Sequence, residues 1–155
     1  MNRTLKRAAA TAFLVMAAAA SSFAQAPADK KPEQAKVAPH PAAASPAYAE
    51  LLLKRTELLS QLESLVLEYT EEYPKVKEIR QTLVLIDRES ARLGKVKPAD
   101  STRLTLALGR LMIRKIELET DLWGLRKTFQ DEHPDVKRAQ RRVEIYEAAI
   151  GEILN

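Results

Sequence analysis

Acidic residues and a histidine crowd one short stretch late in the sequence, and these side chains are Asp131, Glu132, His133 and Asp135. Carboxylate oxygens and imidazole nitrogens are ligands that divalent metals such as zinc accept in proteins. A proline follows the histidine, however, and acids beside the first turn of a helix stabilise the positive end of its dipole. The matching stretch sixty residues earlier has Tyr73 in place of the histidine and Lys75 in place of the last acid. We therefore favour the helix-end interpretation and expect neither a metal site nor a cofactor.

Two further acids, Glu57 and Glu117, stand at matching positions sixty residues apart and could be read as an acid–base pair. Catalysis also needs a reacting group, donors that stabilise developing charge and a cleft that holds substrate. The sequence shows no nucleophile constellation and no glycine-rich loop. We therefore expect a non-enzymatic protein without catalytic residues.

Arg55, Lys115 and Trp123 are the candidates for a partner-binding surface. The two basic residues interrupt runs of leucine, where they could bind an anionic partner or pair with Glu57 or Glu117. We favour a third interpretation, in which their aliphatic stems pack while the charged heads reach solvent. Trp123 either contacts a partner or, as we favour, fills a gap at the edge of the helices.

The stretch that carries the acids occurs twice, and this repeat organises the rest of the chain. Both copies have an aromatic residue, an acid, a second ring, a proline and a valine at the same spacing. In order they are Tyr69, Glu72, Tyr73, Pro74 and Val76, then Phe129, Glu132, His133, Pro134 and Val136. Leucines before each copy match at the same offset, which a shared helical pattern alone would explain. The match of Glu-x-Pro-x-Val-Lys has no such explanation, so we infer an internal duplication.

Apolar residues around both copies recur at alternating intervals of three and four, which is typical of amphipathic helices. The predicted inward residues are Leu51, Leu58, Leu62, Leu65 and Tyr69, then Val76, Ile79, Leu83, Ile86 and Leu93, then Leu104, Leu108, Leu111, Leu118, Leu122, Leu125 and Phe129, then Val136, Ala139, Val143, Tyr146, Ile150 and Ile153, with Leu52, Leu59 and Val66 widening the first stripe. Gly94 and Pro98 are expected to end the second helix, and Asp100 or Ser101 to cap the third. The prediction is an all-α fold of two duplicated antiparallel helical hairpins, with four helices in a coiled-coil-like bundle.

The proline of each copy decides whether each half is a hairpin. Proline inside a helix costs about 3 kcal/mol, whereas at the first position of a helix it costs little. It also disfavours helical geometry at the residue before it. These effects favour a turn. The apolar spacing nevertheless runs unbroken through the proline, as a single kinked helix would require, and both interpretations stay open.

The N-terminal segments differ in composition from the helical part. Residues 1–24 combine basic residues with an alanine-rich apolar run that ends in small residues, which is the pattern of a cleavable export signal. Residues 25–47 are rich in alanine and proline and are expected to form a disordered linker. The helical domain should then span residues 48–155, with repeats at 48–94 and 100–154.

The charge balance excludes one class of partner. The chain has 25 basic and 21 acidic residues, and removing the three basic residues of the signal leaves it nearly neutral. The high isoelectric point is therefore largely a property of the signal, and we expect no nucleic-acid partner. The helical part has no apolar run long enough to span a membrane. We expect a periplasmic or secreted protein.

The second copy of the motif resembles the coiled-coil segment of chain-length determinant proteins. These polysaccharide co-polymerases include forms fused to exopolysaccharide tyrosine kinases. The residues that carry the resemblance are Leu125, Phe129, His133, Pro134 and Val136, and in the first copy Leu65, Tyr69, Tyr73, Pro74 and Val76. The family also has two flanking membrane helices and an α/β base, which this sequence does not show. The resemblance therefore implies an envelope setting and a helical hairpin rather than control of chain length.

These observations predict a structural or adaptor component of the cell envelope, with a link to polysaccharide export left open. Its partners would be envelope proteins that bind through helix faces, and a homo-oligomer also stays open. The alternative is a small periplasmic helical chaperone or a metal-responsive stress protein. A chaperone would need a sizeable exposed apolar patch.

Overall fold

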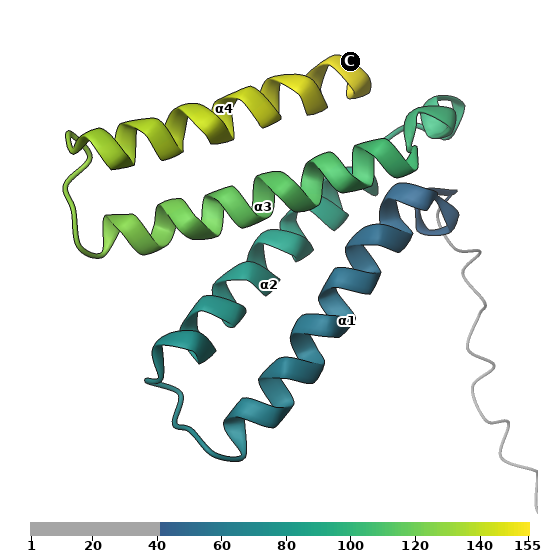
Figure 1. Ribbon diagram of the computed structural model, residues 1–155. Coiled ribbons are helices and arrows are strands. Elements are labelled where there is room, and N and C mark those ends of the chain that lie inside the picture. Colours follow the sequence, from purple (N-terminus) through teal and green to yellow (C-terminus); the bar gives the residue numbers. More distant parts are fainter. Residues whose placement is uncertain (1–40) are drawn as a thin grey trace, which may run out of the picture. The chain divides into compact units, whose positions relative to one another are not determined.

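The computed structural model describes residues 41–155, and helices are the regular secondary structure of this part of the chain. The predicted export signal and the predicted linker as far as residue 40 lie outside the described residues. In chain order the elements are the 3₁₀ helix η1 (Pro41–Ala44), α1 (Pro46–Val66), α2 (Pro74–Leu93), the 3₁₀ helix η2 (Pro98–Arg103), α3 (Leu106–Arg126) and α4 (Pro134–Leu154) (Figure 1). The predicted all-α fold with four main helices is confirmed. No helix within residues 41–155 is both long and apolar enough to cross a membrane.

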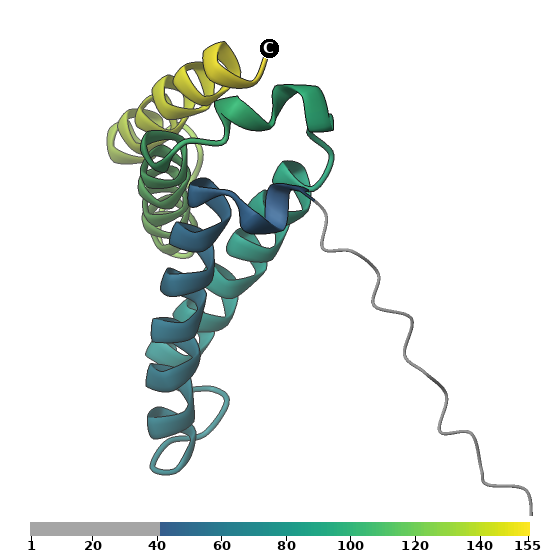
Figure 2. The ribbon, with the colours of Figure 1, turned by 90° about the vertical axis from the view of Figure 1, so that its right-hand side faces the viewer.

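Each repeat folds into a pair of antiparallel helices. The chain runs along α1 and returns along α2, then runs along α3 and returns along α4 (Figures 1 and 2). Helix α3 packs against α1, α2 and α4, so it joins the two hairpins. The hairpins cross, and their tips point in different directions (Figure 1). Residues of both hairpins therefore share one core around α3, and a regular coiled-coil geometry stays a prediction.

Helix α1 begins at Pro46, two residues before the expected start at Tyr48. The hydroxyl of Ser45 accepts a hydrogen bond from the backbone N–H of Tyr48 at 3.2 Å. A serine in this position satisfies one of the N–H groups that a helix start leaves without a partner. Proline at the first position is tolerated for the same reason. The helical part therefore extends into the segment that composition alone assigns to the linker.

The expected cap of the third helix at Asp100 or Ser101 is wrong. Both residues lie inside η2, and α3 begins at Leu106 behind the N-cap Thr105, whose hydroxyl accepts from the N–H of Leu108. The reason lies in Leu104, whose side chain is buried in the core. Its backbone has left helical geometry at ψ 58°, and its carbonyl accepts from the N–H of Ala47. This packing separates η2 from α3.

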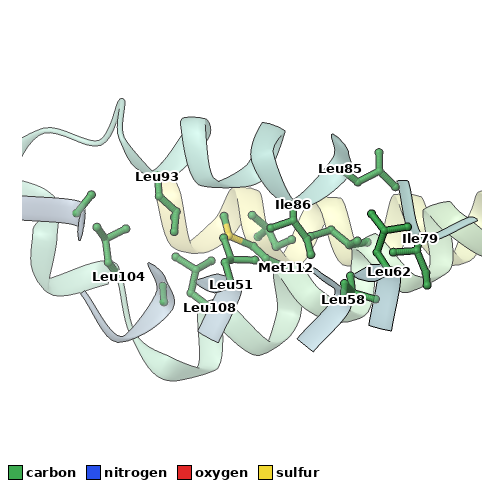
Figure 3. Close-up of a cluster of buried hydrophobic side chains, with 14 of the residues drawn as sticks. Leu51, Leu58, Leu62, Ile79, Leu85, Ile86, Leu93, Leu104, Leu108 and Met112 are labelled. Carbon is green, nitrogen blue, oxygen red and sulfur yellow. The ribbon is translucent and has the colours of Figure 1, made fainter. Parts of the chain in front are cut away.

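Half of the predicted inward residues are buried. The largest fully buried apolar side chains come from all four helices and from the residue before the cap of α3; they are Leu51, Val76, Ile79, Ile86, Leu93, Leu104, Leu108, Met112, Ile116, Leu118 and Ile150. Figure 3 shows those of α1, α2 and α3 among them, such as Leu51, Ile86 and Met112. Leu62 and Leu122, which match between the repeats, are 8% and 7% exposed. Burying a leucine side chain stabilises a fold by about 1.5–3 kcal/mol, so this cluster is the main source of stability.

Several predicted inward residues instead lie at the surface. Leu52 is 49% exposed and Val66 is 37% exposed, and the motif rings Tyr69 and Phe129 are also exposed. In α3, by contrast, Met112 and Ile116 are buried although the predicted stripe omits them. The difference arises because α3 packs against three helices, α1, α2 and α4, whereas α1 packs mainly against α2 and α3.

Candidate functional site

The two copies of the motif form the tips of the two hairpins. Helix α1 ends at Val66 and α2 begins at Pro74, so the intervening residues reverse the chain. Tyr73 and His133, which precede the prolines, have ψ angles of 129° and 138°. Such extended geometry is what a following proline imposes. The turn interpretation is therefore right, and the single kinked helix is wrong.

The two tips share two backbone hydrogen bonds. The N–H of Tyr73 donates to the carbonyl of Thr70 at 3.0 Å, and the N–H of His133 donates to the carbonyl of Gln130 at 3.0 Å. In each tip the N–H of the first aromatic residue also donates to the carbonyl of the leucine four residues before it. The repeat that the sequence predicts is thus also a repeat of backbone conformation.

The aromatic residues of each tip stack on each other. The ring centroids of Tyr69 and Tyr73 lie 4.2 Å apart, and those of Phe129 and His133 lie 4.1 Å apart. The interplanar angles are 16° and 24°, so both pairs are stacked. Aromatic pairs of this kind add about 0.5–1.5 kcal/mol beyond the area they bury. The four-residue spacing of the rings therefore lets them stack and stabilise the turn. Because they pack on each other at the tip, they lie outside the core.

The residues considered for a metal site have other partners. The Nδ1 atom of His133 accepts a hydrogen bond from the N–H of Asp135 at 3.2 Å. Asp131 pairs with Arg126 at 2.8 Å, and Asp135 pairs with Arg138. The hydrogen bond from Arg138 lowers the pKa of Asp135 below its ordinary value. Within residues 41–155 no group of three or more histidine, cysteine or acidic side chains is placed to hold a metal ion.

An open cleft of about 740 Å³ lies beside the tip of the second hairpin. Pro74 and Glu78 of α2 line it, together with Trp123 at the end of α3 and Phe129 in the tip. The ammonium group of Lys127 lies over the Trp123 ring, 3.1 Å from its centroid. The structure therefore brings together Pro74 of the first repeat and Trp123 and Phe129 of the second, which the sequence singles out for separate reasons.

The lining of the cleft combines apolar and ring surface with charges of both signs. Besides the residues above it includes Leu118, Thr120, Asp121, Gly124, Leu125, Lys127, Thr128, Asp135, Arg138, Ala139 and Arg142. Tryptophan with basic residues at the edge is the composition of protein–protein hot spots. Trp123 is half-buried and only partly fills the space, and its contact with a partner stays a prediction.

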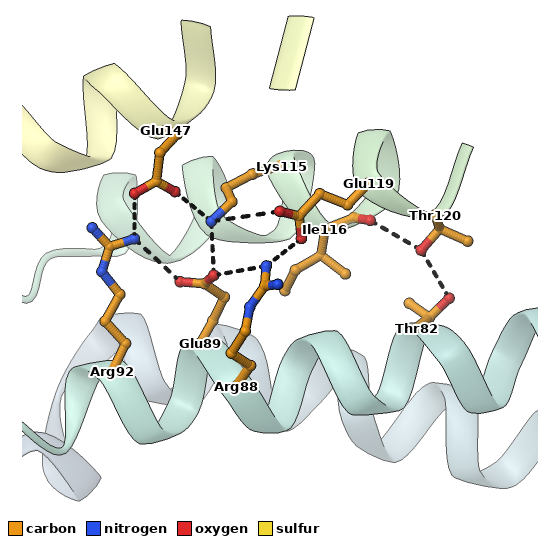
Figure 4. A network of polar contacts seen from close by, with 9 residues as sticks. All are labelled: Thr82, Arg88, Glu89, Arg92, Lys115, Ile116, Glu119, Thr120 and Glu147. Carbon is orange, nitrogen blue, oxygen red and sulfur yellow. Dashed lines mark hydrogen bonds and ion pairs between the residues drawn. The ribbon is translucent and has the colours of Figure 1, made fainter. Parts of the chain in front are cut away.

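Arg55 and Lys115 lie away from the cleft and in different surroundings. The Nε atom of Arg55 pairs with Asp87 Oδ1 at 3.0 Å, and both side chains are well exposed. Lys115 is buried, and its Nζ atom pairs with Glu89 Oε1 at 2.8 Å and with Glu147 (Figure 4). The expectation that the charged head reaches solvent is therefore wrong for Lys115. Neither residue pairs with the acids proposed from the sequence.

The buried lysine is the centre of an ionic network that links α2, α3 and α4 (Figure 4). Its acidic members are Glu89, Glu119 and Glu147, and its basic members are Lys115, Arg88 and Arg92. Burial opposes ionisation of Glu147, but the hydrogen bond and charge of Lys115, together with Arg92, outweigh it and lower the pKa. This network is a structural connection between the hairpins, and it has solvent on one side.

The duplication extends to the partners of the two basic residues. Asp87, which pairs with Arg55, and Glu147, which pairs with Lys115, stand sixty residues apart. These two acids and Glu89 are not among the candidate residues predicted from the sequence. The offset could have identified Asp87 and Glu147, because a basic residue at matching positions of two apolar stripes predicts matching acids on the neighbouring helices. Nothing in the repeat points to Glu89, since its counterpart is Ala149.

The fold and the cleft define a class of protein: an all-helical double hairpin with a surface cleft beside one tip. A scan against protein-family models and searches of curated proteins and of solved structures gave no match. The resemblance to chain-length determinant proteins therefore stays a hypothesis that depends on the motif residues alone.

Proposed function

We propose that this chain is an exported, non-enzymatic adaptor of the cell envelope that binds a protein partner in the cleft beside the second tip. The observation that carries the proposal is the lining of this cleft, where Trp123, Phe129 and Pro74 meet at one surface. Aromatic anchors in a partly desolvated hollow contribute most of the energy of protein binding. The export signal pattern in residues 1–24 supports an envelope location.

The charges around the cleft indicate what kind of partner segment it favours. Lys127, Arg138 and Arg142 bring basic groups to its lining, and Asp121 and Glu78 bring acids. Such a mixed rim gives orientation and specificity more than affinity. A helix or extended segment with apolar anchors and charges of both signs would fit, in agreement with an adaptor that binds through helix faces. The resemblance of the tips favours a partner that takes part in polysaccharide export.

Trp123 is the only tryptophan of the chain, and it makes the proposal directly testable. A photo-crosslinking residue placed at Thr128, inside the cleft, should capture a discrete envelope protein in living cells. The same residue placed at Gln140, which is exposed on α4 outside the cleft lining, should capture none. The purified partner should then shift the tryptophan emission. Equal capture at both positions, or no capture at either, would overturn the assignment of the cleft.

A specific observation also favours the alternative, a small helical chaperone. Large apolar side chains are exposed along the helices, among them Leu52, Leu53, Val84, Leu106 and Ile145. Exposed apolar surface of this kind is what a chaperone needs to hold unfolded clients. An assay of aggregation suppression with unrelated client proteins separates the two functions, because an adaptor with one partner should not protect them.

A further inference from the structure

The contact between the two hairpins is made by surfaces that differ from each other. On one side is a docking face of α3, which we define by Gly109, Met112, Ile116, Glu117 and Thr120. On the other side is a receiving groove of the first hairpin, which we define by Ala47, Glu50, Leu51, Lys54 and Ile86. Met112 and Ile116 are buried in this contact, and a β-carbon on Gly109 would lie 2.9 Å from Ala47 Cα and Glu50 Cβ.

Polar contacts fix the register of the docking face in the groove. Lys54 of α1 and Glu117 of α3 form an ion pair at 3.5 Å. The hydroxyl oxygens of Thr82 and Thr120 lie 3.1 Å apart, which joins α2 to α3. Because a face of the second hairpin meets a groove of the first, the contact is heterologous. In such an arrangement each repeat keeps one unused surface.

The duplication gives the second hairpin its own copy of the receiving groove. The residues sixty positions after those of the groove are Ala107, Arg110, Leu111, Arg114 and Tyr146. All five line a groove of about 650 Å³ on α3 and α4, together with Leu106. In the first hairpin the equivalent groove is filled by α3. In the second hairpin it is open.

The first hairpin likewise has its own copy of the docking face. The residues sixty positions before those of the face are Ala49, Leu52, Thr56, Glu57 and Ser60. All five are exposed, and they include one of the large apolar side chains found at the surface. Ala49 stands in place of Gly109, and its β-carbon would hold a second copy farther from α1 than α1 and α3 lie from each other. The chain thus has one open docking face and one open groove, which correspond by position in the repeat to the face and the groove that join its own two hairpins.

The charges of the open surfaces also match. Lys54 of the filled groove corresponds to Arg114 of the open groove, and both are basic. Glu117 of the bound docking face corresponds to Glu57 of the open docking face, and both are acidic. Glu57 forms no ion pair within the part of the chain that the structure describes. Arg114 lies at the surface, where it pairs with Glu117 one turn along α3 at 2.9 Å. An interface between two copies would therefore repeat the ion pair that already joins the two hairpins of one copy.

We propose that the open docking face of α1 binds the open groove of a second copy of this chain. The second copy then continues the stacking of hairpins that each chain makes within itself. Because face and groove differ, the association is head-to-tail, and it forms either a closed ring or a growing row. It uses surfaces away from the cleft and does not depend on the proposed adaptor function.

Two surface substitutions test the proposal because each blocks one side only. Leu52→Asp places a charge on the docking face, and Ala107→Glu places one in the groove. Light scattering and sedimentation of the purified chain should show association that rises with concentration, and each variant alone should be monomeric. An equimolar mixture of the two variants should give dimers and nothing larger, since it contains one intact face for each intact groove. Loss of a central apolar contact is expected to weaken association by about tenfold or more.

The matched control is Leu67→Asp, because Leu67 is 86% exposed in the first tip and belongs to neither surface. This variant should associate as the unchanged chain does. A second pair addresses the charges: Glu57→Lys and Arg114→Glu should each weaken association by a few-fold, and the chain with both changes should recover it. Circular dichroism should show the same helix content in all variants.

Three results would overturn the proposal. The first is an unchanged chain that stays monomeric at every concentration. The second is association that neither substitution affects. The third is a mixture of the two variants that stays monomeric, which would indicate a symmetric contact or a contact elsewhere.

Discussion

Arg55 and Lys115 occupy the same position in the two repeats but contribute differently to stability. Arg55 and its partner Asp87 have side chains that are 40% and 59% exposed. An ion pair at such a site contributes about 0–1 kcal/mol, because solvent screens the charges. Lys115 and Glu89 are buried. Removal of one charge from a buried pair leaves the other without compensation and costs about 3–5 kcal/mol.

We predict that Lys115→Ala lowers the free energy of unfolding by about 3 kcal/mol. Arg88 and Arg92 also approach Glu89, at 3.4 Å and 3.6 Å, and should keep the loss at the lower end of the range. The matched control Arg55→Ala should cost less than about 1 kcal/mol. Urea unfolding followed by circular dichroism measures both. Equal losses in the two variants would show that burial does not separate them.

The same network offers a second check of the mechanism. In the double variant Lys115→Met with Glu89→Leu, both buried charges are replaced by apolar groups of similar size. Exchanges of this type are often neutral or stabilising. Most of the stability lost in Lys115→Ala should therefore return. If the double variant is as unstable as the single one, the loss arises from packing of the lysine stem.

At the scale of the elements, the tips show why proline is tolerated in these hairpins. Pro74 and Pro134 occupy the first turn of α2 and α4, where a missing N–H leaves no hydrogen bond broken. Each hairpin is closed by buried leucine, isoleucine and valine side chains, which contribute about 1.5–3 kcal/mol apiece. Straightening a hairpin would give up much of this packing in return for a few backbone hydrogen bonds. The packing therefore outweighs the continuous apolar spacing, and the turn persists.

We predict that replacing both Pro74 and Pro134 with alanine leaves the protein compact and monomeric at low concentration. Each change should lower the free energy of unfolding by about 0.4–1 kcal/mol, because alanine gives the unfolded chain more conformations. Pro46→Ala is the matched control, since Pro46 also begins a helix but lies outside the tips. Small-angle scattering and urea unfolding check both statements. An elongated double variant would show that the prolines themselves enforce the turns.

For the whole molecule, the decisive contact is the close approach of α1 and α3. Gly109 lies where these helices cross, and a β-carbon there would meet backbone and side-chain atoms of α1 at 2.9 Å. Separations this short force a shift of the surrounding atoms. The other glycine of α3, Gly124, has open space around its position. The two glycines therefore separate the effect of helix propensity from the effect of packing between hairpins.

We predict that Gly109→Ala destabilises the protein by about 1–3 kcal/mol, because the hairpins must move apart. Gly124→Ala should instead stabilise it by about 0.5–1 kcal/mol, since alanine is the better helix former. Thermal unfolding followed by circular dichroism measures both changes. Stabilisation by both substitutions would mean that the two hairpins adapt to a wider spacing without loss.

Interactions between residues close together in the sequence determine much of this fold. The spacing of leucines predicted the helices, the match at sixty residues predicted the repeat, and proline geometry at Tyr73 and His133 favoured the turns. Each of these depends on interactions within a few residues along the chain, such as helix periodicity and the steric effect of proline. The burial of Leu62 and Leu122 was also predicted from the apolar face of each helix, although the same pattern does not bury Leu52 and Val66.

Packing between distant segments decided the rest. Only the fold shows that Lys115 is buried while the side chain of the equivalent Arg55 is 40% exposed, because α3 packs against three helices and α1 mainly against two. The cap at Thr105 depends on burial of Leu104, and the cleft needs Pro74 to lie near Trp123. A duplicated sequence gives its two halves the same local preferences. The asymmetric contact between the halves gives equivalent residues different neighbours. The periodicity of the sequence does not predict that contact, because periodicity depends only on residues within one helix.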